Sequence, residues 1–418
     1  MKTVRTFGAL LFVFVLMLSA CAAPAAPSAA PAADDSTAAS ADSSALPESI
    51  KIGAVIPLTG RFGAGGAQIQ RGYELAVEAI NADGGVDVQG TKIPLEMIVV
   101  DDESDPAKTV QRLEDLNSND QVLVYLGGFG SPLHAAAAGI AEKNKIPYLG
   151  VAFAFQGVHA NGFKYLFSPF PKSPELAKAT LDLFDSLDPK PTNLFGFIEK
   201  TDWGAEMNAE WQAQAEERGY SYTLEEYAPG DQDFSAMILR AKEAGADAVL
   251  SLPTPPDGLA IAKQMKELDF NPAASVVIRA ADGPNWPENL GKDGDYVLLM
   301  TGWSNDISLP GVAEMNEAHV AKYESPATPI TGPAYNVLLV LADAIGRAAT
   351  LDRDGIRDAL AATDMSESLI GPVKFREDGS AEVLTVVSQY QDGKTVSVWP
   401  PDVAAAQIVY PAPAYSER

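Results

Sequence analysis

The chain has 418 residues, of which 47% are hydrophobic, and its 56 acidic and 30 basic side chains give a formal net charge of -26 at pH 7. So acidic a chain repels phosphate backbones, which excludes nucleic acid as a partner, and its length is sufficient for two domains. One cysteine and three histidines far apart in sequence give no zinc-ligand spacing, and no nucleophile-base pattern is present, so we expect no metal, no cofactor and no enzyme activity.

The N-terminus has the composition of an export signal. Lys2 and Arg5 precede an apolar stretch over residues 7–17, which is shorter than the roughly 20 residues that a membrane-spanning helix needs. The following Leu-Ser-Ala-Cys sequence, which ends at Cys21, resembles a bacterial lipobox. The resemblance implies a signal peptide over 1–20 and a lipid on Cys21, so that an extracytoplasmic protein is attached to the membrane through this lipid only. The alternative is an ordinary signal peptide with an incidental cysteine.

Residues 21–47 are rich in Ala, Pro, Ser, Asp and Thr, and Leu46 is the one leucine among them. Because such a segment buries too little apolar surface to offset the entropy of ordering, we expect a flexible stalk. The folded part is expected to begin at residue 48.

Strands and helices alternate in the first part of the folded region. A buried strand over 50–56 ends at Pro57, and a glycine-rich turn over 60–66 leads into a helix whose apolar residues are spaced for one face. Alternation of this kind predicts a parallel sheet covered on both faces. The further expected elements are strands over 93–100, 122–126 and 146–149, and helices from Pro106 and from Ser131.

A second alternating series predicts a separate α/β unit. Its expected strands cover residues 194–198, 220–227, 248–252 and 275–279, and its expected helices cover 203–218, 234–244 and 258–268. Three further helices are expected over 312–323, 334–349 and 355–362, followed by a β-hairpin at Asp392-Gly393.

Several short sequence blocks, taken together with their order and spacing, resemble those of the type I periplasmic binding proteins of the leucine/isoleucine/valine-binding family. These proteins are ligand receptors of ABC importers. The blocks are residues 50–60, 72–85, 100–106, 202–204, 233–238 and 332–336. The resemblance implies two lobes, each a doubly wound parallel-sheet domain, with the ligand in the cleft between them at the carboxyl ends of the strands. It implies a first lobe of 48–170 plus 302–380 and a second of 171–301 plus 381–410, with crossovers near 170, 302 and 380.

Ser131 is the first candidate for a ligand contact. Ser131-Pro132 is typical of a helix start, with Ser as N-cap and Pro at the first helical position, and this end of a helix attracts a carboxylate. Glycines before it, including Gly130, permit a close approach. In the resembling family a serine here holds the carboxylate of the ligand; the alternative is a purely structural cap.

Other candidates depart from the family pattern. Ala152, Phe153 and Ala154 align with a segment that carries a threonine in the family, and this chain has none there. The family's glutamate for the ligand ammonium would fall near Ala280, where Asp282 is the nearest carboxylate. Asp282 either replaces that glutamate or is a solvated turn residue.

Aromatic and polar residues complete the candidate set. Trp203 begins a helix where the family places a ring over the ligand, and the alternative is ordinary packing at a helix start. Phe62 in the first glycine-rich turn adds a second ring, and Thr254 lies in a loop where the family uses a tyrosine.

The chain is thus expected to be a solute-binding lipoprotein that closes on a carboxylate-bearing ligand, an amino acid of the branched-chain type, and delivers it to an ABC permease. The missing threonine and glutamate leave open aromatic or aliphatic carboxylates or amides. A ligand sensor that partners a signalling receptor is a further alternative.

Overall fold

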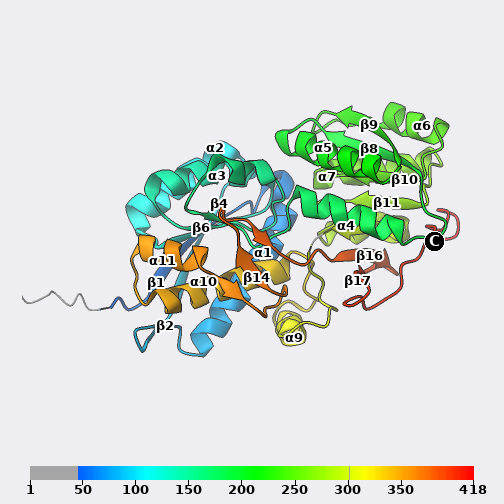
Figure 1. The fold of residues 1–418 in the computed structure, drawn as a ribbon. Coiled ribbons are helices and arrows are strands. Elements are labelled where there is room, and N and C mark those ends of the chain that lie inside the picture. Colours follow the sequence, from blue (N-terminus) through cyan, green and yellow to red (C-terminus); the bar gives the residue numbers. More distant parts are fainter. Residues whose placement is uncertain (1–45, 301) are drawn as a thin grey trace, which may run out of the picture. The chain divides into compact units, whose positions relative to one another are not determined.

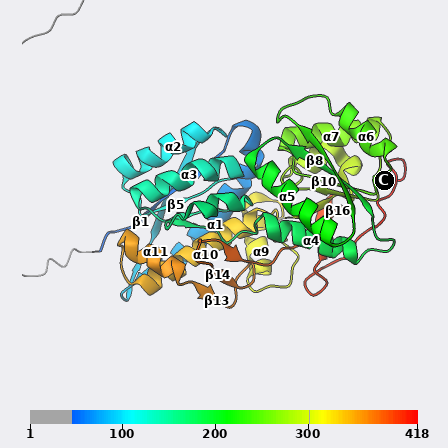
Figure 2. The same ribbon diagram turned by 45° about the horizontal axis from the view of Figure 1, so that its top comes forward.

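The computed structural model describes residues 46–300 and 302–418. The predicted signal peptide, Cys21 and the stalk up to residue 45 lie outside the described residues. Residues 47–418 form one unit, and two large sheets organise it (Figures 1 and 2).

The first sheet has five strands in the order β4-β1-β5-β6-β7, and each neighbouring pair is parallel. Strand β1 lies between β4 and β5, because Ile52 pairs with Met97 on one side and with Val124 on the other. The strands are β1 (Ile50–Ile56), β4 (Leu95–Asp101), β5 (Val124–Leu126), β6 (Tyr148–Leu149) and β7 (Leu166–Phe167).

Helices cover both faces of this sheet because side chains alternate along each strand. Ile52, Ala54 and Ile56 face the core shared with α1 and α10, whereas Val55 faces the core shared with α2 and α3. In Figure 1 the orange α10 and α11 lie beside the blue β1, so the chain returns to this sheet after leaving it. The helices are α1 (Gly63–Ala82), α2 (Pro106–Asp115), α3 (Ser131–Asn144), α9 (Val312–Tyr323), α10 (Thr331–Ala348) and α11 (Arg353–Ala361).

The second sheet has seven strands in the order β17-β16-β12-β11-β10-β8-β9. Strands β8 to β12 are parallel, and the expected hairpin, β16 and β17, adds antiparallel strands at the β12 edge. The strands are β8 (Asn193–Glu199), β9 (Ser221–Tyr227), β10 (Ala248–Ser251), β11 (Ala274–Val277), β12 (Leu298–Met300), β16 (Val387–Gln391) and β17 (Lys394–Trp399).

Helices also flank this sheet on both faces. Leu194, Leu250 and Val276 pack against α4 and α5, and Phe195 and Val249 pack against α6 and α7. The helices are α4 (Ser173–Asp185), α5 (Asp202–Glu217), α6 (Ser235–Glu243), α7 (Pro255–Glu267) and α8 (Asn285–Leu290). The predicted α/β class with parallel sheets covered on both faces is therefore confirmed.

The remaining elements are short. They are the hairpin β2 (Val86–Val88) and β3 (Thr91–Ile93), the strands β13 (Asp364–Met365), β14 (Val373–Phe375) and β15 (Ala381–Glu382), the 3-10 helices η1 (Gly60–Phe62), η3 (Gln156–Asn161) and η4 (Gly291–Gly294), and the π-helical turn η2 (Leu116–Asp120). The chain leaves the first sheet after β7 and enters the second at β8; it leaves the second after β12 and returns to it at β16.

Some expected boundaries are wrong for local reasons. The helix expected from residue 258 begins at Pro255, since Thr254 caps it and prolines are tolerated in the first turn. The strand expected to reach residue 279 ends at Val277, and Arg279 has a left-handed backbone with φ of 74°. Helix α4 was not anticipated at all.

Among the described residues, no single helix is long and apolar enough to cross a membrane; α10 and α11 together meet that length and composition, with a bend of 113° between them.

Candidate ligand-binding site

A cavity of about 340 Å³ lies where loops of both sheets meet, at the carboxyl ends of β5, β6 and β11. Ligands of open α/β sheets bind at this end of the strands. The lining residues are Phe129, Gly130, Ser131, Ala152, Ala154, Phe170, Leu176, Trp203, Ile278, Arg279, Asp282, Met300 and Ile330. Most are apolar, and the polar side chains are confined to Ser131, Arg279 and Asp282.

Ser131 enters the cavity at the first turn of α3. The structure corrects its expected role as N-cap: Gly130 occupies that position with φ of 107°, and Ser131 is the first helical residue with Pro132 behind it. Its side chain makes no capping bond. The residue is 1% exposed, and its Oγ has no hydrogen-bond partner among the described residues. A buried hydroxyl without a partner costs free energy, so Ser131 is available to a ligand at a helix end that favours anions.

Asp282 enters from the loop after β11. It is 6% exposed, and its Oδ1 has no hydrogen-bond partner among the described residues. Burial raises the pKa of this carboxyl to about 7, and the opposing charge of Arg279 offsets burial only in part. Asp282 is therefore not a solvated turn residue. It is a buried carboxyl group with one oxygen free to accept a hydrogen bond from a cationic group.

Arg279 lies in the same loop and was missed by the sequence reasoning. Its Nη2 pairs with Glu199 at 2.6 Å, and both side chains are buried. Nη2 also donates to the carbonyl of Leu252 at 2.8 Å, and Nε donates to that of Pro253 at 3.1 Å. A buried guanidinium charge is costly unless it is paired and hydrogen-bonded, as it is here. Glu199 ends β8, and no local motif in the sequence connects it to Arg279.

Trp203 lies in the first turn of α5, which Thr201 caps by accepting from the N–H of Gly204 at 3.0 Å. The indole lines the cavity, and its Nε1 donates to Ser173 Oγ at 3.1 Å. The guanidinium carbon of Arg279 lies 5.1 Å from the centre of the ring. Trp203 is thus both a wall of the cavity and a buried part of the second-sheet core.

Ala152 and Ala154 line the cavity, but Phe153 between them does not. Its ring stacks on His134 and His159, with centroid separations of 4.3 and 5.7 Å. Lys172 lies over the same ring, with Nζ 3.8 Å from its centre, and donates to the carbonyl of Phe153 at 2.9 Å. Burial lowers the pKa of Lys172 well below its usual value. Phe153 therefore supports the cavity loop from behind.

Phe62 and Thr254 also lie outside the lining. Phe62 is buried, packs on Phe129 with a centroid separation of 6.1 Å, and lies 5.6 Å from the guanidinium carbon of Arg279. Thr254 is the N-cap of α7, where its Oγ1 accepts from the N–H of Asp257. The structure places Phe62 behind the cavity wall and assigns Thr254 to helix capping.

The comparisons with known proteins cover nearly the whole folded region. A family model described as periplasmic binding protein matches residues 49–394. The chain belongs to this family. Among curated relatives, it is 27% identical over 382 residues to Leu/Ile/Val-binding protein homolog 7 of Brucella abortus (strain 2308), which spans 87% of this chain and 94% of the relative.

Two solved structures have the same fold. One is the branched-chain amino acid transporter substrate binding protein LivJ from Streptococcus pneumoniae in complex with isoleucine, with a TM-score of 0.74 and 22% identity over 87% of this chain and 100% of that chain. The other is an ABC transporter solute binding protein from R. palustris in complex with benzoate, with a TM-score of 0.74 and 19% identity over 87% of this chain and 98% of that chain.

The predicted two-lobed type I fold is therefore confirmed, and the protein is a periplasmic binding protein related to branched-chain amino acid binders. Both solved structures are titled as substrate- or solute-binding proteins of transporters, one holding isoleucine and the other benzoate. Among the described residues, no group of three or more His, Cys, Asp or Glu side chains could hold a metal ion.

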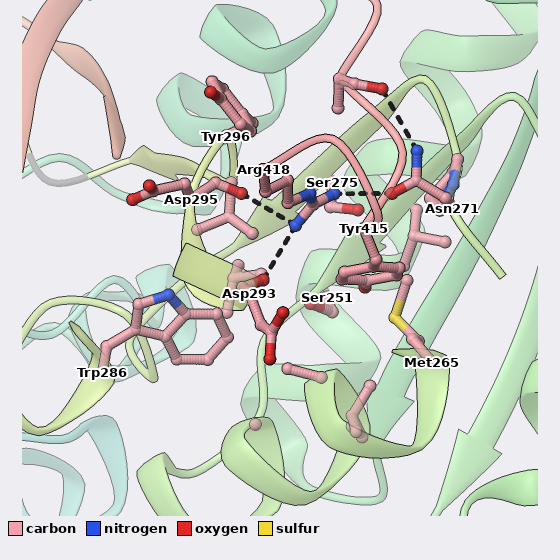
Figure 3. Close-up of a pocket in the computed structure, with 18 of the residues that line it drawn as sticks. Ser251, Met265, Asn271, Ser275, Trp286, Asp293, Asp295, Tyr296, Tyr415 and Arg418 are labelled. Atoms are coloured by element: carbon pink, nitrogen blue, oxygen red, sulfur yellow. Dashed lines mark hydrogen bonds between the residues drawn. The ribbon is translucent and has the colours of Figure 1, made fainter. Parts of the chain in front are cut away.

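This binding protein has a second cavity, of about 550 Å³, between strands β10 and β11, helix α7 and the C-terminal segment (Figure 3). Arg418 closes it by donating from Nη1 to the carbonyls of Asp293 and Asp295 and from Nη2 to Asn271 Oδ1. Among the described residues that line this second cavity, no buried polar side-chain atom lacks a hydrogen-bond partner. This contrasts with Ser131 and Asp282, and the first cavity is the better candidate for the ligand.

Proposed function

We propose that this protein binds an α-amino acid with a small aliphatic side chain and delivers it to an ABC permease. The observation that carries the proposal is the pair of buried polar atoms without partners in one cavity, Ser131 Oγ and Asp282 Oδ1. The first, at the start of α3, suits a carboxylate, and the second suits an ammonium group. A ligand that carries both groups gives each of these two atoms a hydrogen-bond partner.

The rest of the cavity supports an aliphatic side chain. Phe170, Leu176, Met300 and Ile330 contribute apolar surface without a polar atom from their side chains. Each buried methylene of a ligand is worth about 0.8 kcal/mol against such walls. Leucine, isoleucine and valine fit this description.

A carboxylate without an amino group is the weaker candidate. Such a ligand would leave Asp282 Oδ1 buried without a partner and would add a second negative charge near it. Truncating one member of a buried charge pair costs about 2–5 kcal/mol, which corresponds to a loss in affinity of about 30-fold or more.

Calorimetric titration of residues 48–418 tests the proposal with leucine, isoleucine and valine against 4-methylpentanoate, which is leucine without its amino group. We expect the amino acids to bind at least about 30-fold more tightly than this acid. Asp282→Asn should abolish the preference. Asp257→Asn is the matched control, because Asp257 is equally buried on the same lobe but already accepts from the N–H of Gly230 at 3.1 Å. Equal binding of leucine and the acid by the wild type would contradict the proposal.

We further propose that Cys21 carries a lipid and that the stalk holds the folded part above the membrane. The Leu-Ser-Ala-Cys sequence supports this. Intact-mass measurement of the mature protein should show a diacylglyceryl addition on Cys21 and none in Cys21→Ser. A mature N-terminus without a lipid would contradict the proposed lipid anchor and would leave the proposal about the ligand intact.

A further inference from the structure

Arg279 has donors that the protein does not use. Its Nε and Nη2 bond to Pro253, Glu199 and Leu252, whereas none of the described residues accepts a hydrogen bond from Nη1. The side chain is 4% exposed and lines the ligand cavity. The N–H groups of a guanidinium are the donors best suited to a carboxylate.

The guanidinium is held in place. Glu199 fixes one edge, and the rings of Trp203 and Phe62 lie 5.1 and 5.6 Å from its central carbon. The backbone of Arg279 is left-handed, with φ of 74°, a conformation that side-chain-bearing residues adopt at a cost and that clusters at functional sites. Nη1 therefore keeps one position beside the cavity.

Phe62 connects Arg279 to the start of α3. A Cβ built on Gly130 would lie 3.3 Å from the ring of Phe62, and the guanidinium of Arg279 contacts the same ring. Gly130 directly precedes Ser131. Ser131 and Arg279 line the same cavity, Ser131 from the helix that follows β5 and Arg279 from the loop that follows β11.

We infer that Arg279 Nη1 and Ser131 Oγ hold the same ligand carboxylate, one from each lobe, so that Arg279 sets the specificity for a free carboxylate. This inference rests on the proposed function. Because Asp282 lies in the same short loop, with its N–H donating to the carbonyl of Arg279 at 3.3 Å, the groups for carboxylate and ammonium are close together. The substrate class is α-amino acids with an unmodified carboxylate, and amides, esters and amino acids with a distant amino group are rejected.

The test compares leucine with leucinamide, which keeps the ammonium and loses the carboxylate charge. We expect wild-type protein to prefer leucine by at least about tenfold in calorimetric titration. A Glu199→Gln/Arg279→Gln double variant removes both members of the buried pair, so that no charge is stranded. In it the preference for leucine over leucinamide should fall at least about tenfold, while the preference for leucine over 4-methylpentanoate, which depends on Asp282, persists.

Arg279→Lys is the second variant, since lysine keeps the positive charge but lacks the paired N–H donors of a guanidinium. It should lose part of the preference for leucine over leucinamide. If the double variant fails to fold, the inference is decided by Arg279→Lys and by the ratio of the leucine and leucinamide affinities of the wild type. Equal binding of leucine and leucinamide by the wild type, or an unchanged ratio in a folded variant, overturns the inference and leaves the proposed function standing. Absence of any amino-acid binding by the wild type overturns both.

Discussion

Ser173 donates a hydrogen bond of 2.5 Å from its hydroxyl to Glu206 Oε1, in the α5 helix. The same carboxylate accepts from the backbone N–H groups of Gln156 and Gly157, at 2.8 and 2.7 Å, which belong to the segment that follows the first sheet's cavity loop. Ser173 Oγ also accepts from Trp203 Nε1. Glu206 thereby joins two segments that position opposite walls of the ligand cavity.

Replacing Glu206 by alanine is expected to weaken amino-acid binding by about tenfold or more. The change leaves the partly buried N–H groups of Gln156 and Gly157 without their acceptor and removes the acceptor of the Ser173 hydroxyl, which contacts Trp203. A buried polar group without a partner costs about 1–3 kcal/mol, which is the upper bound for each of these groups. The affinity is measured by calorimetry and the environment of the indole by tryptophan fluorescence. Glu210→Ala, one turn further along α5, is the control, because the carboxylate of Glu210 accepts a hydrogen bond from Gln214 of the same helix and not from a cavity segment. A lower melting temperature with unchanged affinity and fluorescence would show a merely structural role.

Ligand binding should depend on pH through Asp282. The pKa of this carboxyl is about 7 without ligand, so it is protonated below that value and cannot pair with an ammonium group. Affinity should therefore fall as the pH drops below 7. Binding should also release a proton near pH 6.5, because the ammonium lowers the pKa of Asp282 in the complex. Titrations in buffers with different ionisation enthalpies measure that proton.

The same carboxyl affects the stability of the ligand-free protein. Its pKa in the fold lies above the ordinary value of 3.8, so its favourable contribution is complete below pH 3.8 and is lost as the pH rises through about 7. Asp282→Asn should accordingly raise the melting temperature at pH 8 and bind ligand without proton release. Proton release that persists in this variant would assign the titration to another group.

Gly72 sets the contact between helices α1 and α10. A Cβ at this position would lie 2.4 Å from the carbonyl oxygen of Thr331 and 2.8 Å from the Cβ of Ala334. Gly72→Ala should therefore reduce the free energy of unfolding by about 1–3 kcal/mol through overpacking. Urea unfolding measures this change in the free energy of unfolding, with Gly139→Ala as the control. Gly139 lies inside α3 with nothing within 4 Å of its built Cβ, so its replacement should stabilise by about 0.5–1 kcal/mol. Equal effects would refute the packing argument.

Local patterns in the sequence were enough for much of the fold and part of the site. The alternation of apolar strands with helical periodicity predicted both parallel sheets, because burial on both faces demands it. Ser131 was predicted from a Ser-Pro helix start and Trp203 from its place at a strand end, and both line the cavity. The expected capping by Ser131 was wrong, because Gly130, with φ of 107°, is the N-cap and Ser131 is already the first helical residue.

The sequence by itself determined most of the alternating strands and helices, the family, and the short motifs that place Ser131 and Trp203 in the first turns of helices and Asp282 in a loop. These depend on residues close together in the chain. Only the tertiary structure decided that Arg279 is held by Glu199 beside the cavity, that Phe153 is covered by Lys172, and that Asp282 is buried without a partner. The reason is physical: burial and ion pairing depend on which distant segments meet, and those contacts form only when both sheets are assembled.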